Sequence, residues 1–176
     1  MAEKGETATV FVYDTSTQLK KNSLSTPNVE SQEYVSMAFA PGQEYKFLIT
    51  LSGAPDYTLV YWHWERPKVS AFISVSTSPV YQISFNILDH SNGIIATGQN
   101  VFRWYKFDEG KLIPTATSIA RKDPNLSTNY ILHQWLNDGN LIVENDMGQL
   151  LILDPSCEYI GYLFPSIENY IAYSII

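Results

Sequence analysis

The sequence has few of the residues that would support a disulfide, a metal centre or a thiol-dependent reaction. Of its 176 residues only Cys157 is a cysteine, so no disulfide can form within the chain, which fits a reducing compartment. No Cys/His cluster has the spacing of a structural zinc site. Cys157 has no histidine near it in sequence, and we interpret it as a structural thiol in a loop or strand.

Positive charge is also scarce. The chain carries 11 Lys and Arg against 18 Asp and Glu, a formal net charge of -7. An acidic chain without a basic run repels phosphate groups, so neither nucleic acid nor an anionic membrane is an expected partner. The N-terminal residues MAEKGETATV are not expected to be a secretion signal, and no apolar run approaches the length of a membrane span.

The usual motifs of catalysis and cofactor binding are missing. There is no G-x-S-x-G, no P-loop and no G-x-G-x-x-G after a strand. The three histidines, His63, His90 and His133, stand on different segments, and structural or surface imidazoles are favoured over metal ligands. Asp89-His90-Ser91 is better interpreted as a turn than as a triad, because adjacent residues cannot take up triad geometry. We therefore predict no catalytic, cofactor-binding or metal site.

Apolar and aromatic residues are plentiful, at 45% and 14% of the chain, with 12 tyrosines and only 16% charged residues. Such a composition is typical of one compact, β-rich domain. The stretch Tyr34–Glu65 shows the pattern that the rest of the chain repeats. Three runs of alternating or β-branched residues are separated by Pro41-Gly42 and by residues 52–56, which predicts an antiparallel meander with strands at Tyr34–Ala40, Tyr45–Leu51 and Tyr57–Trp64.

The remaining strands are expected in groups of similar layout. Pro114 places the run at Lys111–Thr117 at a sheet edge. An irregular edge strand is expected around Leu19–Leu24, and the opening strand of a further copy at 167–176. The other predicted strands are Thr7–Tyr13, Val69–Val75, Val80–Phe85, Ile94–Thr97, Val101–Phe107, Asn129–Leu136, Leu141–Glu144, Gln149–Leu153 and Tyr159–Phe164.

Two sets of markers repeat at one period. Acidic residues close the third strand of each group at Asp14, Glu65, Asp108 and Asp154, with spacings of 51, 43 and 46 residues. Aromatic residues near the end of each first strand, Phe39, Phe85 and Trp135, are 46 and 50 residues apart. A four-stranded WD40 propeller blade takes about 40–45 residues. A β-sandwich would give similar short strands without such a period.

The chain is therefore predicted to be all-β and part of a WD40-type β-propeller, with about three full four-stranded blades and partial blades at both ends. The domain is expected to span 1–176, with blades at about 7–32 (partial), 33–76, 79–119, 127–164 and 165–176 (the start of the next). Aromatic–acid pairs such as Trp64-Glu65 resemble a degenerate WD dipeptide. Its acid is expected to bond turn backbone and its aromatic ring to fill the space between blades.

Two segments resemble a known family. The patterns L-V-Y-W-x-W-E-x-x-K-V at Leu59–Val69 and N-Y-x-x-H-x-W at Asn129–Trp135 are similar to the first propeller of the cilia- and flagella-associated WD-repeat proteins. The resemblance implies a non-enzymatic scaffold of the axoneme, in the cytoplasm and cytoskeleton of the cilium or flagellum. Its implied partners are axonemal proteins, with inner dynein arm or regulatory-complex components foremost. A general cytoplasmic WD40 adaptor stays open as an alternative, and an enzyme acting at the central channel is disfavoured.

The number of predicted blades is too small for a closed ring, because propellers close with about 4–8 blades. An open arc exposes apolar blade faces that favour association. We expect the remaining blades to come from the same or another chain.

Overall fold

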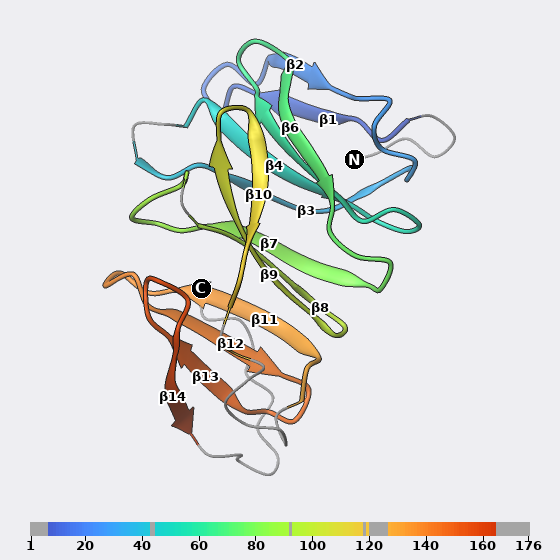
Figure 1. Ribbon diagram of the computed structural model, residues 1–176. Helices are drawn as coiled ribbons and strands as arrows, with labels where there is room; N and C mark the ends of the chain where they lie inside the picture. The colour runs from blue at the N-terminus through green and yellow to red at the C-terminus, as the bar shows by residue number, and fades with distance from the viewer. Residues whose placement is uncertain (1–6, 43–44, 92, 118, 120–126, 165–176) are drawn as a thin grey trace.

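Fourteen β-strands make up the regular structure in the part of the chain that the structure describes. The computed structural model describes residues 7–42, 45–91, 93–117, 119 and 127–164, and in these residues there is no α-helix. The strands form sheets that follow one another along the chain (Figure 1), so the all-β prediction is confirmed. A helix long and apolar enough to cross a bilayer is accordingly not found in these residues.

Three of the sheets have four strands each, and strands that are neighbours in sequence pair antiparallel in every sheet. The predicted meander is thus confirmed. Pro114 lies on β10, an edge strand, as expected. The strands are β3 (Tyr34–Phe39), β4 (Phe47–Ser52), β5 (Thr58–His63) and β6 (Lys68–Ser74); β7 (Val80–Phe85), β8 (Ile94–Gly98), β9 (Val101–Asp108) and β10 (Lys111–Thr115); and β11 (Tyr130–Trp135), β12 (Leu141–Asn145), β13 (Leu150–Leu153) and β14 (Tyr159–Phe164).

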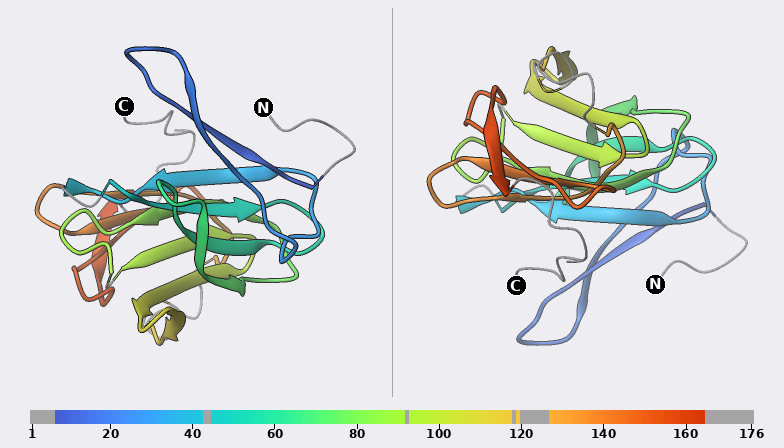
Figure 2. Two further views of the ribbon diagram at one scale, coloured as in Figure 1. Left: turned by 90° about the horizontal axis from the view of Figure 1, so that it is seen from above. Right: turned by 90° about the horizontal axis from the view of Figure 1, so that it is seen from below.

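A two-stranded sheet precedes these three. It pairs β1 (Val10–Tyr13) with β2 (Lys20–Leu24), which confirms the predicted irregular strand around Leu19–Leu24. The loop that joins the two strands extends away from the other sheets (Figure 2). The predicted opening strand of a further copy at 167–176 lies outside the described residues.

The first strand of each four-stranded sheet has the same irregular register. The pairing skips one residue after Tyr34, after Val80 and after Tyr130, so that Val35, Tyr81 and Ile131 each lie in a β-bulge. The aromatic markers also match, since Phe39, Phe85 and Trp135 are each the last residue of a first strand. These two agreements confirm that the sheets are repeats of one unit.

Apolar cores fill the spaces between successive sheets. The largest, between the β3–β6 and β7–β10 sheets, includes Phe107, which stacks on Tyr61 at 4.0 Å, so this aromatic–acid pair does fill the space between blades. The prediction is wrong for Tyr13, which is 57% exposed. Asp14 accepts hydrogen bonds from the backbone N–H groups of Ser16 and Thr17, as expected for the acid of such a pair. Asp154, which follows Leu153, accepts in the same way from Ser156 and Glu158.

Gly98 on β8 has no room for a side chain. A Cβ there would lie 2.2 Å from the Pro79 carbonyl oxygen and 2.6 Å from the Val80 Cα, both backbone atoms. We expect Gly98→Ala to lower the free energy of unfolding by about 2 kcal/mol, because β7 and β8 must move apart. Gly161→Ala on β14, where no atom lies within 4 Å of the new Cβ, is the matched control and should change stability little. Urea unfolding of both variants tests this, and equal stabilities would contradict it.

Candidate protein-interaction surfaces

His63 and His90 both pack against Phe47. The ring centroids of His63 and Phe47 are 5.4 Å apart, and those of His90 and Phe47 are 5.9 Å apart. His63 lies on the face of its sheet opposite Trp62, as the alternation predicts. The two imidazoles thus take part in aromatic packing between the β3–β6 and β7–β10 sheets, and neither is held in a ligand cluster.

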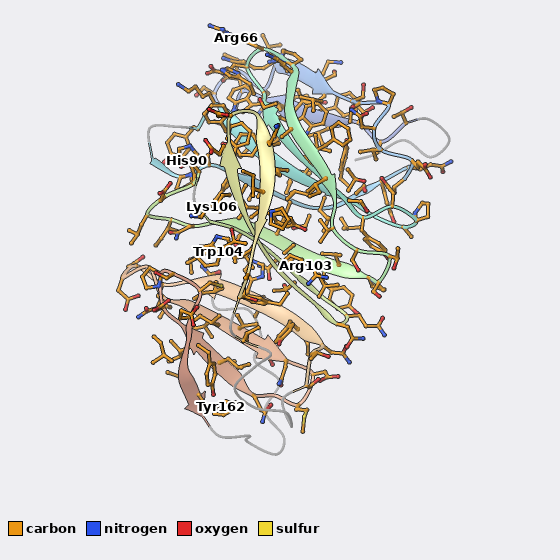
Figure 3. The ribbon with its side chains drawn as sticks, in the orientation of Figure 1. Arg66, His90, Arg103, Trp104, Lys106 and Tyr162 are labelled. Atoms are coloured by element: carbon orange, nitrogen blue, oxygen red, sulfur yellow. The ribbon has the colours of Figure 1, made fainter. Side chains whose placement is uncertain are left out.

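The segment Asp89-His90-Ser91 is a turn. The Asp89 carboxylate accepts hydrogen bonds from the Ser91 backbone N–H and from its hydroxyl, at 3.1 and 2.7 Å. The His90 ring (labelled in Figure 3) stacks on Phe47 of the β3–β6 sheet. The interpretation as a turn is confirmed.

His133 on β11 is the centre of a buried polar network between two sheets. Its Nδ1 lies 2.8 Å from the Thr97 hydroxyl and its Nε2 lies 2.7 Å from the Ser84 hydroxyl. The Trp135 indole N–H donates to the same Ser84 oxygen at 3.0 Å. Gln82 adds a pair of bonds to the His133 backbone, accepting from its N–H at 2.9 Å and donating to its C=O at 3.0 Å.

The imidazole in this network is neutral at physiological pH. His133 is 1% exposed, and burial lowers its pKa from 6.5 to about 3. A neutral ring donates from one nitrogen and accepts at the other, and a hydroxyl group suits either role. His133 therefore joins the β7–β10 and β11–β14 sheets as a structural group, and Trp104 meets Trp135 edge-on in the same junction.

The other residues singled out from the sequence are also structural. Cys157 lies in a loop and is 1% exposed, and burial raises the pKa of its thiol. Tyr105 is buried, and Tyr57 and Tyr162 are half-buried and pack against the cores, so these tyrosines contribute to packing and not to an exposed surface. Across the described ranges no group of three His, Cys, Asp or Glu side chains is placed to hold a metal ion.

A row of apolar side chains does reach solvent, at the three bulges. Val35, Tyr81 and Ile131 are 44%, 48% and 48% exposed at matching positions of the first strands. β3 lies next to β7, and β7 next to β11, so these side chains follow one another along one rim of the array. We call the rim bearing Val35, Tyr81 and Ile131 the bulge rim.

Side-chain hydrogen bonds hold the loops of the bulge rim in place. The Asp56 carboxylate accepts from the backbone N–H groups of Glu30 and Ser31 and from the Ser52 hydroxyl, at 3.1–3.3 Å. Two sheets further on, Asn129 accepts from the Asn100 backbone N–H at 3.2 Å and donates to Asp146 at 2.8 Å. The rim is therefore a preorganised surface on which apolar side chains stand among acidic ones.

The bulge rim could not be found from the sequence alone. Within each first strand the bulged residue looks like one more member of an apolar run, since nothing local distinguishes Tyr81 from Ile83. Only the register shift, which depends on pairing with the second strand, turns it outwards.

Successive four-stranded antiparallel sheets with matching registers and shared cores define a β-propeller architecture. The fold agrees with solved propellers. The β-propeller domain of Cps50 (Swd1) from Myceliophteria thermophila superposes with a TM-score of 0.73 at 16% identity, over 93% of this chain and 50% of that one. A chain of the mitotic checkpoint complex gives 0.63 at 18% identity, over 82% and 42%. The chain is thus part of a WD40-type β-propeller.

The sequence is similar to cilia- and flagella-associated protein 57. It is 35% identical to the mouse protein over 137 residues, 77% of this chain and 10% of that protein. Proteins 57 A and 57 C of Tetrahymena thermophila are 29% and 33% identical, over 85% and 59% of this chain and 12% and 8% of their own lengths. No protein-family model matches. These similarities confirm the resemblance to the ciliary WD-repeat family, and the chain spans about a tenth of the relatives' length.

Proposed function

We propose that the chain is a non-enzymatic WD-repeat module of the cilium or flagellum that binds axonemal proteins through the bulge rim. The observation that carries this is the row of exposed Val35, Tyr81 and Ile131 on the first strands of the three sheets, beside loops that hydrogen bonds hold in place. Exposed apolar side chains at repeated positions on a rigid rim are typical of a protein-binding surface. The similarity to cilia- and flagella-associated protein 57 supports the ciliary location.

The chemistry of the rim favours a protein partner. Asp56 and Asp146 stand beside the apolar row, and the chain as a whole is acidic, so the partner's surface should combine apolar and basic side chains. Components of the inner dynein arms or of their regulatory complexes are the partners we favour, and a general cytoplasmic adaptor is the alternative.

The test is a triple substitution, Val35→Ser, Tyr81→Ser and Ile131→Ser, in the tagged chain expressed in ciliated cells. We expect binding to isolated axonemes to fall by about tenfold, with the unfolding temperature little changed, because all three side chains are exposed. The matched control replaces Leu19, Leu88 and Ile113, apolar residues away from the bulges that are 69%, 63% and 43% exposed, by serine. Equal axoneme binding by both triple variants, or a location outside cilia for the unmodified chain, would refute the proposal.

A further inference from the structure

One face of the β3–β6 sheet is covered at β4 and β5 but not at β3. Leu48, Val60 and Trp62 on this face pack against Val10 and Leu24 of the β1–β2 sheet and are at most 1% exposed. Nearer the first strand, the same face carries Met37 and Phe39 on β3, which are 52% and 48% exposed. The predicted uncovered apolar face is therefore present, and its exposed residues lie on the first strand of the sheet, β3.

In the next two sheets, the positions equivalent to Met37 and Phe39 are covered by the preceding sheet. Ile83 and Phe85 on β7 match Met37 and Phe39 in register and are 2% and 4% exposed, because the preceding β3–β6 sheet covers them. His133 and Trp135 on β11 are 1% and 5% exposed in the same way. In both cases the first two strands of the preceding sheet lie over these positions, and the β1–β2 sheet has no such strands in the described residues.

A specific hydrogen bond accompanies this packing at each complete junction. The third residue of one first strand bonds the backbone of the fourth residue of the next. The Ile83 N–H donates to the Ser36 hydroxyl at 3.2 Å, and the His133 N–H donates to the Gln82 side-chain oxygen at 2.9 Å. Because β3 has the register of β7 and β11, the Met37 N–H points in the same direction, towards the uncovered side.

We propose that the Met37–Phe39 face is the docking site of a β-hairpin that completes the blade begun by β1 and β2. The second strand of the hairpin pairs with the free edge of β1, and its first strand lies alongside β3. Its first strand presents a hydroxyl or carboxamide side chain to the Met37 N–H and a small residue two positions further on, as Ser36 and Ala38 do for β7. This proposal does not depend on the ciliary function.

A second copy of this chain is a poorer occupant. The last sheet described, β11–β14, carries Leu132 at the third position of its first strand, where β3 has Ser36 and β7 has Gln82. A leucine side chain offers no hydrogen-bonding group to Met37. The β1–β2 sheet already packs on the same face, at β4 and β5. The occupant is therefore expected to be the two strands that extend this β1–β2 sheet to four.

Thiol labelling measures whether the face is covered. Met37→Cys places a reactive thiol there, while Cys157 is 1% exposed and its raised pKa keeps it unreactive. Ile131→Cys is the matched control, because Ile131 is 48% exposed and lies on β11. The hairpin to be tested is a copy of residues 33–52 joined to the full chain before Thr7 by a short linker. The serine that copies Ser36 is either kept or changed to leucine.

We expect the serine hairpin to slow thiol labelling of the Met37→Cys variant by at least about tenfold and to leave labelling of the Ile131→Cys variant unaffected. The leucine hairpin should slow labelling of the Met37→Cys variant much less, because it leaves the backbone N–H at position 37 without an acceptor. Unchanged labelling of the Met37→Cys variant with the serine hairpin would overturn the docking site.

Two further outcomes decide the details. Equal protection of the introduced thiol by both hairpins would overturn the role assigned to the hydroxyl group. In the Met37→Cys variant without a hairpin, protection that grows with protein concentration would identify a second copy as the occupant and overturn the proposal.

Discussion

Replacing Trp62 by alanine should lower the free energy of unfolding by about 3–5 kcal/mol. Trp62 on β5 is 1% exposed, and its indole N–H donates to the Thr50 hydroxyl at 2.9 Å. The side chain also joins two sheets, since it packs in the cluster that holds β1 and β2 against β4 and β5. Alanine leaves a cavity at this junction and a buried hydroxyl without its donor.

Denaturant unfolding measures the loss, and hydrogen exchange shows where it falls. In the Trp62→Ala variant the amide hydrogens of β1 and β2 should exchange faster than those of β8 and β12. The reason is that Trp62 packs against the β1–β2 sheet and not against the sheets that contain β8 and β12. Phe72→Ala on β6 serves as the control, since Phe72 is 50% exposed and should change stability by no more than about 0.5 kcal/mol. If Trp62→Ala cost as little as Phe72→Ala, the packing of β1 and β2 on this sheet would be wrong.

The strands and their period could be predicted because their determinants are local. Alternating apolar residues bounded by Pro41-Gly42 or Asn137-Asp138-Gly139 specify short strands and tight turns without reference to the rest of the chain. Recurrence of Phe39, Phe85 and Trp135 then reveals the repeat, since equivalent places in stacked sheets meet equivalent surroundings.

Exposure is harder to predict than strand position. Trp104 and Tyr105 are consecutive and so point to opposite faces of β9, yet both are buried, because the β7–β10 sheet has a neighbour on each side. Tyr105 therefore cannot form part of an outer surface. Phe39 and Phe85 occupy equivalent positions and differ in exposure only through what lies over them, which no local pattern records.

The polar network of His133 is beyond sequence reasoning for a related reason. Its hydroxyl partners, Ser84 and Thr97, are 49 and 36 residues away and belong to the preceding sheet. The sequence shows a histidine two residues before a tryptophan, and this spacing predicts only that both lie on one face of a strand. Which groups they meet depends on how the sheets stack.

Acidification should destabilise the fold through His133. Its pKa is about 3 in the folded chain and about 6.5 when unfolded, so the unfolded chain binds a proton first as the pH falls. The stability that depends on the neutral ring is fully present above about pH 6.5 and is lost progressively towards pH 3. Between about pH 7.5 and about pH 4, the lowered pKa of His133 should reduce the free energy of unfolding by about 3 kcal/mol.

His133→Gln isolates this contribution, because a carboxamide can bond both hydroxyl groups and does not titrate. The carboxylates of Asp14 and Asp146, whose pKa values are lowered by hydrogen bonds, are common to both proteins and cancel in the comparison. Urea unfolding of each protein across the pH range should therefore show a gap in pH dependence of about 3 kcal/mol. If the variant instead fails to fold, the ring resonances of His133 in the unmodified chain decide the matter. Titration of those resonances near pH 6.5 in the folded state would show that the imidazole is not held neutral between Ser84 and Thr97.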